Sequence, residues 1–395
     1  MKKEVAFGYE PNPGPLWNKA FGAALVIASI GALAILLRLL FGLGFSTNLN
    51  DGHPWGLWIT WDVLVGTGLG CGGFGLALLV YLIDVREFSS VMRPAILTGA
   101  LGYSFAGFSV ILDLGRYGNV YHLFLPGHWQ FNSVLFEVAL CIMAYTLILW
   151  VELFPAMLER GVFFGRHVRP GVLERWLFRL LFLVLALGML LPIMHQSSLG
   201  SLLIIAGPKV HPLWQSILFP AYFLISAILM GYGAVVIECY LTSSLYGTPL
   251  EVRTLGRLSG IAAWLSLLYL FVRLEDLTFR GLWAQAMKGW PGMLFVLENA
   301  LYVVPILIVA NKERRYNAGW QFVAALLFIA ASAFYRFNTY WFAYNVHTPW
   351  RYFPSFLEIL VVFGLIGMEV MLYLAAIHFF PILPASRPAL ASSGK

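Results

Sequence analysis

The stretch that decides the fold of this chain is residues 55–84, WGLWITWDVLVGTGLGCGGFGLALLVYLID. A helix of about 20 apolar residues spans the hydrocarbon core of a bilayer. This run is longer than that, and Asp62 is the one charged residue before its end at Asp84. It therefore predicts a transmembrane helix that carries a carboxyl group inside the membrane.

The composition of the whole chain agrees with this prediction. Of its 395 residues, 60% are hydrophobic and only 11% are charged, and the mean hydropathy is +0.79. A soluble domain of this length needs about 25% charged residues. We therefore expect an all-α, polytopic membrane protein. The net charge of +6 is spread over short loops and indicates no nucleic-acid partner.

Ten apolar runs are long enough to cross the membrane. They are residues 18–44, 55–84, 92–115, 132–157, 173–196, 214–243, 254–279, 292–311, 318–340 and 355–381. We expect one membrane domain over residues 1–395, in which residues 18–243 contain the functional site and residues 254–381 are more structural. The run 199–206 is too short to cross and is expected at the interface.

The distribution of Lys and Arg predicts the orientation. An even number of spans puts both termini on one side, and most Lys and Arg residues lie in the loops of that side. The opposite side has only Arg116, Lys209, Arg280, Lys288, Arg336 and Arg351. Because cytoplasmic loops are enriched in positive charge, both termini are predicted to be cytoplasmic. The polar start of the chain does not predict a cleaved signal peptide.

Charged side chains recur at the outer ends of four consecutive spans. At 1.5 Å per residue, Asp62 lies about 12 Å and Glu137 roughly 8 Å from the outer surface. Asp113 ends the third span, and His195 with Gln196 ends the fifth. An ionisable side chain in hydrocarbon is costly, so this clustering favours a functional site.

A purely structural explanation suits some of these residues better than others. Asp113 and Arg116 are three residues apart on a helix and are expected to pair, which alone would stabilise the helix end. Asp62 and Glu137 have no base at helical spacing, so they face a polar cavity or are protonated. His195 is either functional or a satisfied interfacial histidine.

Further charges lie in other parts of the spans. In the later spans the outward ones are expected to form structural pairs, and they are Arg273, Glu275, Asp276, Glu298, Arg336 and Glu358. In the inner half, Glu152 and Glu238 are candidates for a proton route toward the cytoplasm, with Asp84 and Glu369 at similar depth.

The sequence indicates no resident cofactor. Cys71, Cys141 and Cys239 stand alone in apolar runs, which predicts packing residues and no iron–sulfur cluster or metal site. A membrane haem needs two histidines at similar depth. Only His195 and His378 lie in or at the ends of spans, at opposite faces, so no haem is expected. The glycines of residues 66–75 lack the Lys-Ser/Thr ending of a phosphate loop and favour close helix packing instead.

A histidine and carboxylates near the outer face suit a quinone. A quinone is a flat apolar ring with two carbonyl groups that need donors, and its reduction takes up two protons. A histidine and neighbouring carboxylates can donate and relay these protons. The electrons would arrive from a partner docked on the outer loops.

Several long motifs resemble one family of membrane subunits. They are HPWGLWITWDVLVGTGLGCGG (53–73), GYSFAGFSVILDLGRY (102–117), PGHWQFNSVLFEVALC (126–141), LLPIMHQSSLGSLL (190–203) and KVHPLWQS (209–216). These stretches resemble the NrfD/PsrC-like, polysulphide-reductase-type family, and its hydrogenase-2 branch in particular. The resemblance covers residues 38–245 and continues through YFPSFLEIL and FFPILP near the C-terminus.

The resemblance implies a cofactor-free, quinone-reactive subunit of a periplasm-facing respiratory complex in the bacterial inner membrane. Its implied partners are a ferredoxin-like iron–sulfur subunit and the small and large subunits of a nickel–iron hydrogenase, and its substrate is menaquinone. The implied quinone site is in the first helix bundle near the outer face. We expect it to include Trp61, Asp62, Asp113, Arg116, His195 and Gln196.

The same resemblance suggests a proton relay. Glu137 matches the glutamate of the NSVLFE motif, which is thought to move protons in the hydrogenase branch, and Glu152 and Glu238 would extend the route inward. Two more spans than in the eight-span members make the transfer of residue roles less direct. Alone, the subunit would not be a catalyst.

Two other functions remain open from the sequence. An ion or solute transporter would use the carboxylates as coupling sites, and inverted repeats with paired broken helices would favour it. A passive membrane anchor would explain the aromatic outer loops, but it gives no reason for carboxylates at depth.

Overall fold

The computed structural model describes residues 9–12, 14–53, 55–159, 170–344 and 351–385, without the side chains of residues 170–182. This part of the chain is almost entirely helical, and ten of its helical segments are long and apolar enough to cross a membrane. The predicted all-α polytopic fold with ten spans is confirmed.

Nine of the spans are built on one long α-helix each. They are α1 (Lys19–Phe41), α5 (Met92–Asp113), α6 (Val134–Glu159), α7 (Pro170–Ala206), α8 (Phe219–Tyr246), α9 (Val252–Phe279), α11 (Gly289–Ala310), α13 (Ala318–Phe337) and α14 (Phe356–Phe379). Short helical segments connect them or lie beside them: α2 (Leu43–Ser46), η3 (Arg86–Val91), η4 (Tyr117–Phe124), η5 (Pro126–His128), η7 (Gly207–Lys209), α10 (Trp283–Ala286) and α12 (Lys312–Arg315).

The second span is a series of short helices. A π-helix, η1 (Ile59–Gly66), leads into α3 (Thr67–Leu69), and α4 (Gly72–Ala77) leads into a second π-helix, η2 (Leu78–Leu82). The turn between α3 and α4 falls in the glycine-rich stretch. A third π-helix, η8 (Asn338–Phe342), extends α13. Short π-helical segments are frequently found at functional sites.

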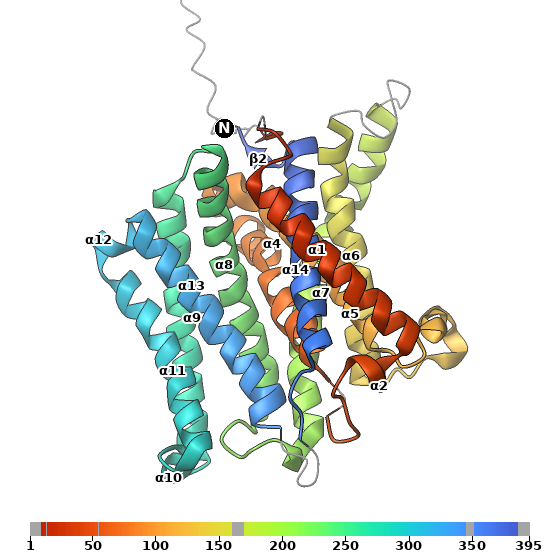
Figure 1. The fold of residues 1–395 in the computed structure, drawn as a ribbon. Helices are drawn as coiled ribbons and strands as arrows, with labels where there is room; N and C mark the ends of the chain where they lie inside the picture. Colours follow the sequence, from red (N-terminus) through yellow and green to blue (C-terminus); the bar gives the residue numbers. More distant parts are fainter. Residues whose placement is uncertain (1–8, 13, 54, 160–169, 345–350, 386–395) are drawn as a thin grey trace, which may run out of the picture.

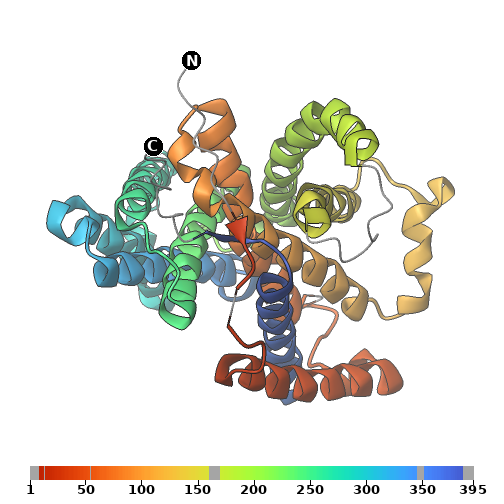
Figure 2. The ribbon, with the colours of Figure 1, turned by 90° about the horizontal axis from the view of Figure 1, so that it is seen from above.

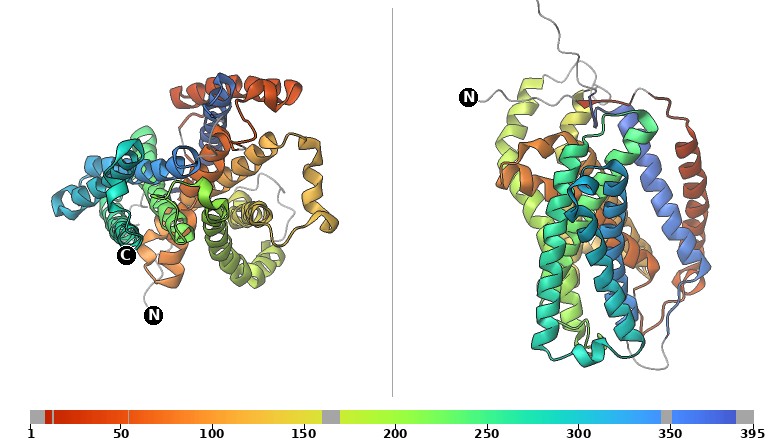
Figure 3. Two further views of the ribbon diagram at one scale, coloured as in Figure 1. Left: turned by 90° about the horizontal axis from the view of Figure 1, so that it is seen from below. Right: turned by 90° about the vertical axis from the view of Figure 1, so that its left-hand side faces the viewer.

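The helices form two groups that share α8. Seen from the side and from above, α9, α11 and α13 lie together on one side of α8, and α5, α6 and α7 lie on the other (Figure 1, Figure 2). Helix α8 packs against α7 and α13, so it joins both groups. Helix α1 lies at the periphery, where it packs along α14 (Figure 3).

Glycine residues allow the closest helix contacts. A Cβ atom at Gly231 of α8 would lie 2.4 Å from the backbone N of Gly72, and one at Gly364 of α14 would lie 2.2 Å from the Cα of Gly31 in α1. Real side chains do not tolerate such distances. The predicted role of the glycine-rich stretch, close approach of a neighbouring helix, is therefore confirmed.

Both ends of the described chain lie on the same side of the helix bundle. The strand β1 (Tyr9–Glu10) pairs antiparallel with β2 (Leu383–Pro384). We call this side the terminal side and the opposite one the far side. The cytoplasmic location of the terminal side stays a prediction.

The fifth span differs from the sequence-based expectation. Helix α7 continues through residues 197–206 and ends at Ala206, so the run 199–206 is the last part of this helix and not a separate interfacial segment. His195 and Gln196 therefore lie well inside the span, and their expected position at its outer end is wrong. Both side chains are fully buried, so the helix does not need to stop at these polar residues.

Candidate functional site

Two aspartates lie on successive turns between η1 and α5. Asp62 of η1 is 2% exposed, and its Oδ2 accepts a 2.5 Å hydrogen bond from the Ser109 hydroxyl. One turn nearer the far side, the indole Nε1 of Trp58 donates to Oδ1 of Asp113 over 2.8 Å. Trp58 and Asp62 are four residues apart on one segment, and Ser109 and Asp113 are four residues apart on the other. Because the two segments are antiparallel, the two hydrogen bonds lie one helical turn apart.

The predicted Asp113–Arg116 pair is wrong. Helix α5 ends at Asp113, so Arg116 is not on the same helical face and is exposed to solvent. A cation that the sequence left unassigned lies nearby instead. The buried Arg38 of α1 donates to the carbonyl oxygens of Leu112 at 2.6 Å and Leu114 at 2.7 Å, and it interacts electrostatically with Asp113.

Glu358 at the start of α14 closes this region on the far side. It is fully buried and forms a capping box with Ser355. Its Oε1 also accepts from the backbone N of Asn48 at 2.9 Å, and its Oε2 accepts from the hydroxyl of Tyr352. Burial, followed by this bond to Glu358, raises the pKa of Tyr352 above its ordinary value, so the hydroxyl stays a donor. Sequence reasoning expected a structural pair here and missed this loop-binding role.

A second polar cluster surrounds His195. Its Nδ1 lies 3.2 Å from the hydroxyl of Tyr103, and Nε2 of the adjacent Gln196 donates to the Thr67 hydroxyl over 3.0 Å. The Tyr103 hydroxyl also lies 3.8 Å from Sγ of Cys71. Within the described residues, the His195 Nε2 and the Gln196 Oε1 have no hydrogen-bond partner, although both atoms are buried.

The two clusters share two segments of the chain, the second span and α5. Thr67 follows Asp62 by five residues, and its backbone N–H donates to the Asp62 carbonyl oxygen as the π-helix ends. Tyr103 precedes Ser109 on α5. We call these two clusters together the polar zone; they hold Asp62, Asp113, His195 and Gln196 between η1, α3, α5 and α7. Of these residues, His195 and Gln196 lie deeper in their span than the sequence predicted.

Arg336 of α13 connects this zone to the other group of helices. Its guanidinium is fully buried and donates to the Leu64 carbonyl at 2.6 Å and to the Phe223 carbonyl at 2.7 Å. Its charge also acts on His195. The sequence predicted a structural charge pair for Arg336 near the outer face, so its contacts with the backbone of η1 and α8 were missed.

Trp61 and Glu137 lie at the edges of this arrangement. The half-buried Trp61 has its ring centroid 6.5 Å from that of Phe337. Glu137 is in the first turn of α6, is half-buried, and its side chain forms no hydrogen bond with any described residue. It lies closer to the far-side end of its helix than the sequence predicted.

Glu152 and Glu238 lie farther toward the terminal side. Glu152 of α6 packs against Gly188 and lines a cavity of about 350 Å³ that also includes Tyr81 and Tyr145. Glu238 of α8 accepts hydrogen bonds from the hydroxyl of Tyr373 and, at 3.2 Å, from that of Thr98. The two carboxyl groups therefore have different surroundings.

A predicted structural pair is confirmed in the later spans. Arg273 of α9 and Glu298 of α11 are both fully buried with 3.6 Å between Nη2 and Oε1. Trp214 and Asn338 donate to the other carboxylate oxygen of Glu298 at 2.8 and 2.7 Å. Because a buried ion pair needs such additional donors, these contacts tie α9, α11 and η8 together.

The fold and site define a class of protein: a multi-pass helical membrane protein with buried carboxyl, imidazole and amide groups in its helix bundle. The family described as "Polysulphide reductase, NrfD" matches residues 45–346. The chain therefore belongs to the NrfD family.

Three relatives are similar over most of the chain. The "Probable Ni/Fe-hydrogenase 2 b-type cytochrome subunit" of Escherichia coli is 37% identical over 94% of this chain and 95% of the relative. The "Menaquinone reductase, integral membrane subunit" of Nitratidesulfovibrio vulgaris is 28% identical over 72% and 71%. The "Hdr-like menaquinol oxidoreductase integral membrane subunit" of Archaeoglobus fulgidus is 22% identical over 92% and 94%.

The name of the first relative includes a b-type cytochrome, and membrane haem b is held by two histidines on facing helices. In this chain His195 faces Tyr103, and His378 lies 3.1 Å from the Gly14 carbonyl on the terminal side. The other described histidines lie outside the ten spans. The described residues thus do not fit a bis-histidine haem, and they contain no cluster of three or more His, Cys, Asp or Glu residues for a metal ion.

Proposed function

We propose that this chain is the quinone-reactive membrane subunit of a respiratory oxidoreductase of the hydrogenase-2 type, in a bacterial inner membrane. Its family and the names of its hydrogenase and menaquinone reductase relatives support this proposal. The observation that carries it is the buried polar zone, in which a histidine nitrogen and an amide oxygen have no partner among the described residues.

The proposed reaction takes two electrons and two protons to convert menaquinone to menaquinol. In this proposal the chain holds no redox group of its own, and the electrons come from a ferredoxin-like iron–sulfur subunit on the far side. That subunit receives them from the small and large subunits of a nickel–iron hydrogenase, which oxidises hydrogen. The far side is periplasmic in this proposal.

The quinone ring would lie beside the polar zone. His195 Nε2, when protonated, donates to one quinone carbonyl, and Gln196 Oε1 accepts from the hydroxyl that forms there. Asp62 and Asp113 hold protons next to the ring. In this proposal, Trp61 and the exposed Arg116 contact the quinone as it enters the site.

Protons reach the site by carboxyl groups in this proposal. Glu137 is the half-buried carboxyl group at the far-side start of α6, where it has access to both solvent and protein. Glu152 and Glu238 continue the route toward the terminal side. The 350 Å³ cavity beside Glu152 offers room for water.

The function is tested on the purified complex with Asp62→Asn. The amide keeps the size and the bond from Ser109 but cannot exchange a proton, so we expect hydrogen-dependent quinone reduction to fall by at least about tenfold. Hydrogen-dependent dye reduction by the partner subunits should be unchanged. The matched control is Glu275→Gln, an exposed carboxyl group on α9.

Equal iron and nickel content in both variants shows that the complex is assembled. Absence of iron, nickel and partner subunits from a complex purified gently from its native host would contradict the hydrogenase assignment. Undiminished quinone reduction by Asp62→Asn would contradict the role of this site.

The proton role of Glu137 is tested separately. Glu137→Gln should abolish quinone-linked hydrogen uptake, because a neutral amide cannot pass protons, while dye-linked activity persists. Both activities are measured on membranes with the same amount of complex. Wild-type quinone reduction in this variant would remove Glu137 from the route.

An ion or solute transporter remains the alternative proposal, and one observation favours it: the second span is discontinuous between α3 and α4. In proteoliposomes, ion or solute uptake that needs neither quinone nor a partner subunit would support the transporter and contradict the quinone proposal. A passive anchor predicts that none of these substitutions changes quinone reduction.

A further inference from the structure

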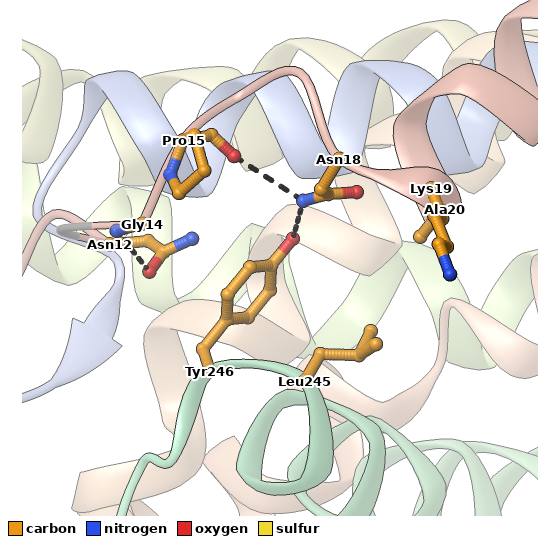
Figure 4. Close-up of a pocket in the computed structure, with 8 residues that line it drawn as sticks. All are labelled: Asn12, Gly14, Pro15, Asn18, Lys19, Ala20, Leu245 and Tyr246. Atoms are coloured by element: carbon orange, nitrogen blue, oxygen red, sulfur yellow. Dashed lines mark hydrogen bonds between the residues drawn. The ribbon is translucent and has the colours of Figure 1, made fainter.

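A cavity of about 530 Å³ opens on the terminal side, where the segment before α1 meets the end of α8 (Figure 4). Its lining residues include Asn12, Asn18, Lys19, Leu245 and Tyr246. None of the residues that line it is acidic. None of the residues that line the cavity belongs to the polar zone, so the cavity has no part in the function proposed above.

Asn12 presents a fixed donor to this cavity. Its side chain is 6% exposed, its Oδ1 accepts from the backbone N of Gly14 at 3.1 Å, and its own backbone N donates to the Ile377 carbonyl at 2.8 Å. The Gly14 bond fixes which amide atom is the oxygen. The remaining Nδ2 has no partner among the described residues, and in Figure 4 it points toward Tyr246 and Asn18.

A second donor comes from the end of α8. The Tyr246 hydroxyl accepts a 3.2 Å hydrogen bond from Nδ2 of Asn18, so its own proton is available for a ligand. Asn18 is also the N-cap of α1, and its Oδ1 accepts from the backbone N of Phe21 at 2.9 Å. The first turn of a helix has free N–H groups and a positive dipole end, which favour an anion.

Lys19 adds a full positive charge beside these donors. It is exposed at the first position of α1 and lines the same cavity. An amide donor, a tyrosine hydroxyl and an ammonium group therefore line one cavity, and none of its described lining residues is acidic. This arrangement suits a phosphate group.

The exposed apolar residues near the cavity indicate that the phosphate group belongs to a lipid. Trp17, next to the cavity in sequence, is 74% exposed, as expected for a residue at the membrane–water interface. Leu245 at the cavity is 54% exposed, and farther along α1 Val26 and Ile30 are also exposed to the bilayer. An acyl chain can therefore lie along α1 while its headgroup is in the cavity.

We propose that this cavity binds the phosphodiester headgroup of an anionic phospholipid of the phosphatidylglycerol or cardiolipin type. The lipid bridges the segment before α1 to the end of α8. It thereby fastens the peripheral helix α1 to the bundle on the terminal side, where α1 otherwise packs mainly along α14.

The test uses the full chain in nanodiscs of phosphatidylcholine with a fixed fraction of phosphatidylglycerol. Native mass spectrometry measures how much phosphatidylglycerol the chain retains on release. Asn12→Asp keeps the acceptor for Gly14 but puts a negative charge in place of the Nδ2 donor. One charge-assisted hydrogen bond corresponds to about a tenfold change in binding, so retention should fall about tenfold. The matched control, Lys312→Gln, changes an exposed lysine of α12 and should retain lipid like the wild type.

Tyr246→Phe is the second variant, since it preserves packing if Asn12→Asp folds poorly. It should lower retention several-fold. Equal retention in all variants, or no preference for phosphatidylglycerol over phosphatidylcholine in the wild type, would overturn the proposal. Equal stabilisation of the chain by inorganic phosphate alone would also overturn it, because the site would then recognise free phosphate and not a lipid.

Discussion

Arg38 shows how a charged residue is accommodated inside this bundle. It is 1% exposed, although it lies within the apolar run of the first span. Its guanidinium reaches the carbonyl groups of Leu112 and of the C-cap residue Leu114, where α5 has unsatisfied acceptors and the negative end of its dipole. A cation there stabilises the helix end and lies beside Asp113 without needing an ion pair of its own.

Replacement of Arg38 tests this contact. Arg38→Gln removes two charged hydrogen bonds, each of about 1.5–3 kcal/mol, so the free energy of unfolding should fall by at least about 2 kcal/mol. The midpoint of thermal unfolding in detergent should fall accordingly. Arg116→Gln is the control for stability, because Arg116 is exposed. If Arg116→Gln lost more unfolding free energy than Arg38→Gln, the result would support the predicted Asp113–Arg116 pair and contradict the contacts of Arg38 described here.

At the scale of elements, most spans could be predicted from the sequence because the membrane requires a fixed length of apolar helix. The prediction failed for α7, whose span was expected to end at His195 and Gln196 but continues to Ala206. These polar side chains instead find partners on other helices, such as Thr67 and Tyr103. Such partners are set by tertiary packing, which no local pattern reveals.

Helix contacts through glycine give a prediction at the same scale. Gly364→Ala places a Cβ about 2.2 Å from the Cα of Gly31, so α14 and α1 must separate. We expect a loss of about 1–3 kcal/mol from this overpacking, seen as a lower unfolding midpoint. Gly22→Ala on α1 has no atom within 4 Å of its new Cβ and should be neutral or slightly stabilising. Equal effects of both substitutions would mean that α1 and α14 do not pack as described.

At the scale of the molecule, the candidate site depends on contacts between distant parts of the chain. The sequence identified Asp62, Asp113, His195 and Gln196, because charged or polar side chains stand out in apolar runs. It did not identify the partners Trp58, Ser109, Tyr103 and Thr67, which are ordinary membrane residues. It also treated the later helices as more structural, although Arg336 of α13 binds the backbone of η1.

The orientation of the whole molecule decides which compartment meets the polar zone. The strand pair β1–β2 places both ends of the described chain on the terminal side, and the excess of Lys and Arg predicts that this side is cytoplasmic. A fluorescent protein fused to the C-terminus should therefore fluoresce in the cytoplasm. Alkaline phosphatase inserted in the far-side loop near residues 282–288 should be active, because this enzyme needs the oxidising periplasm.

The opposite pattern would put Asp62, Asp113 and Glu358 at the cytoplasmic end of the bundle. An iron–sulfur partner in the periplasm would then be unable to dock beside the site, and the electrons for the quinone would have to come from a cytoplasmic donor.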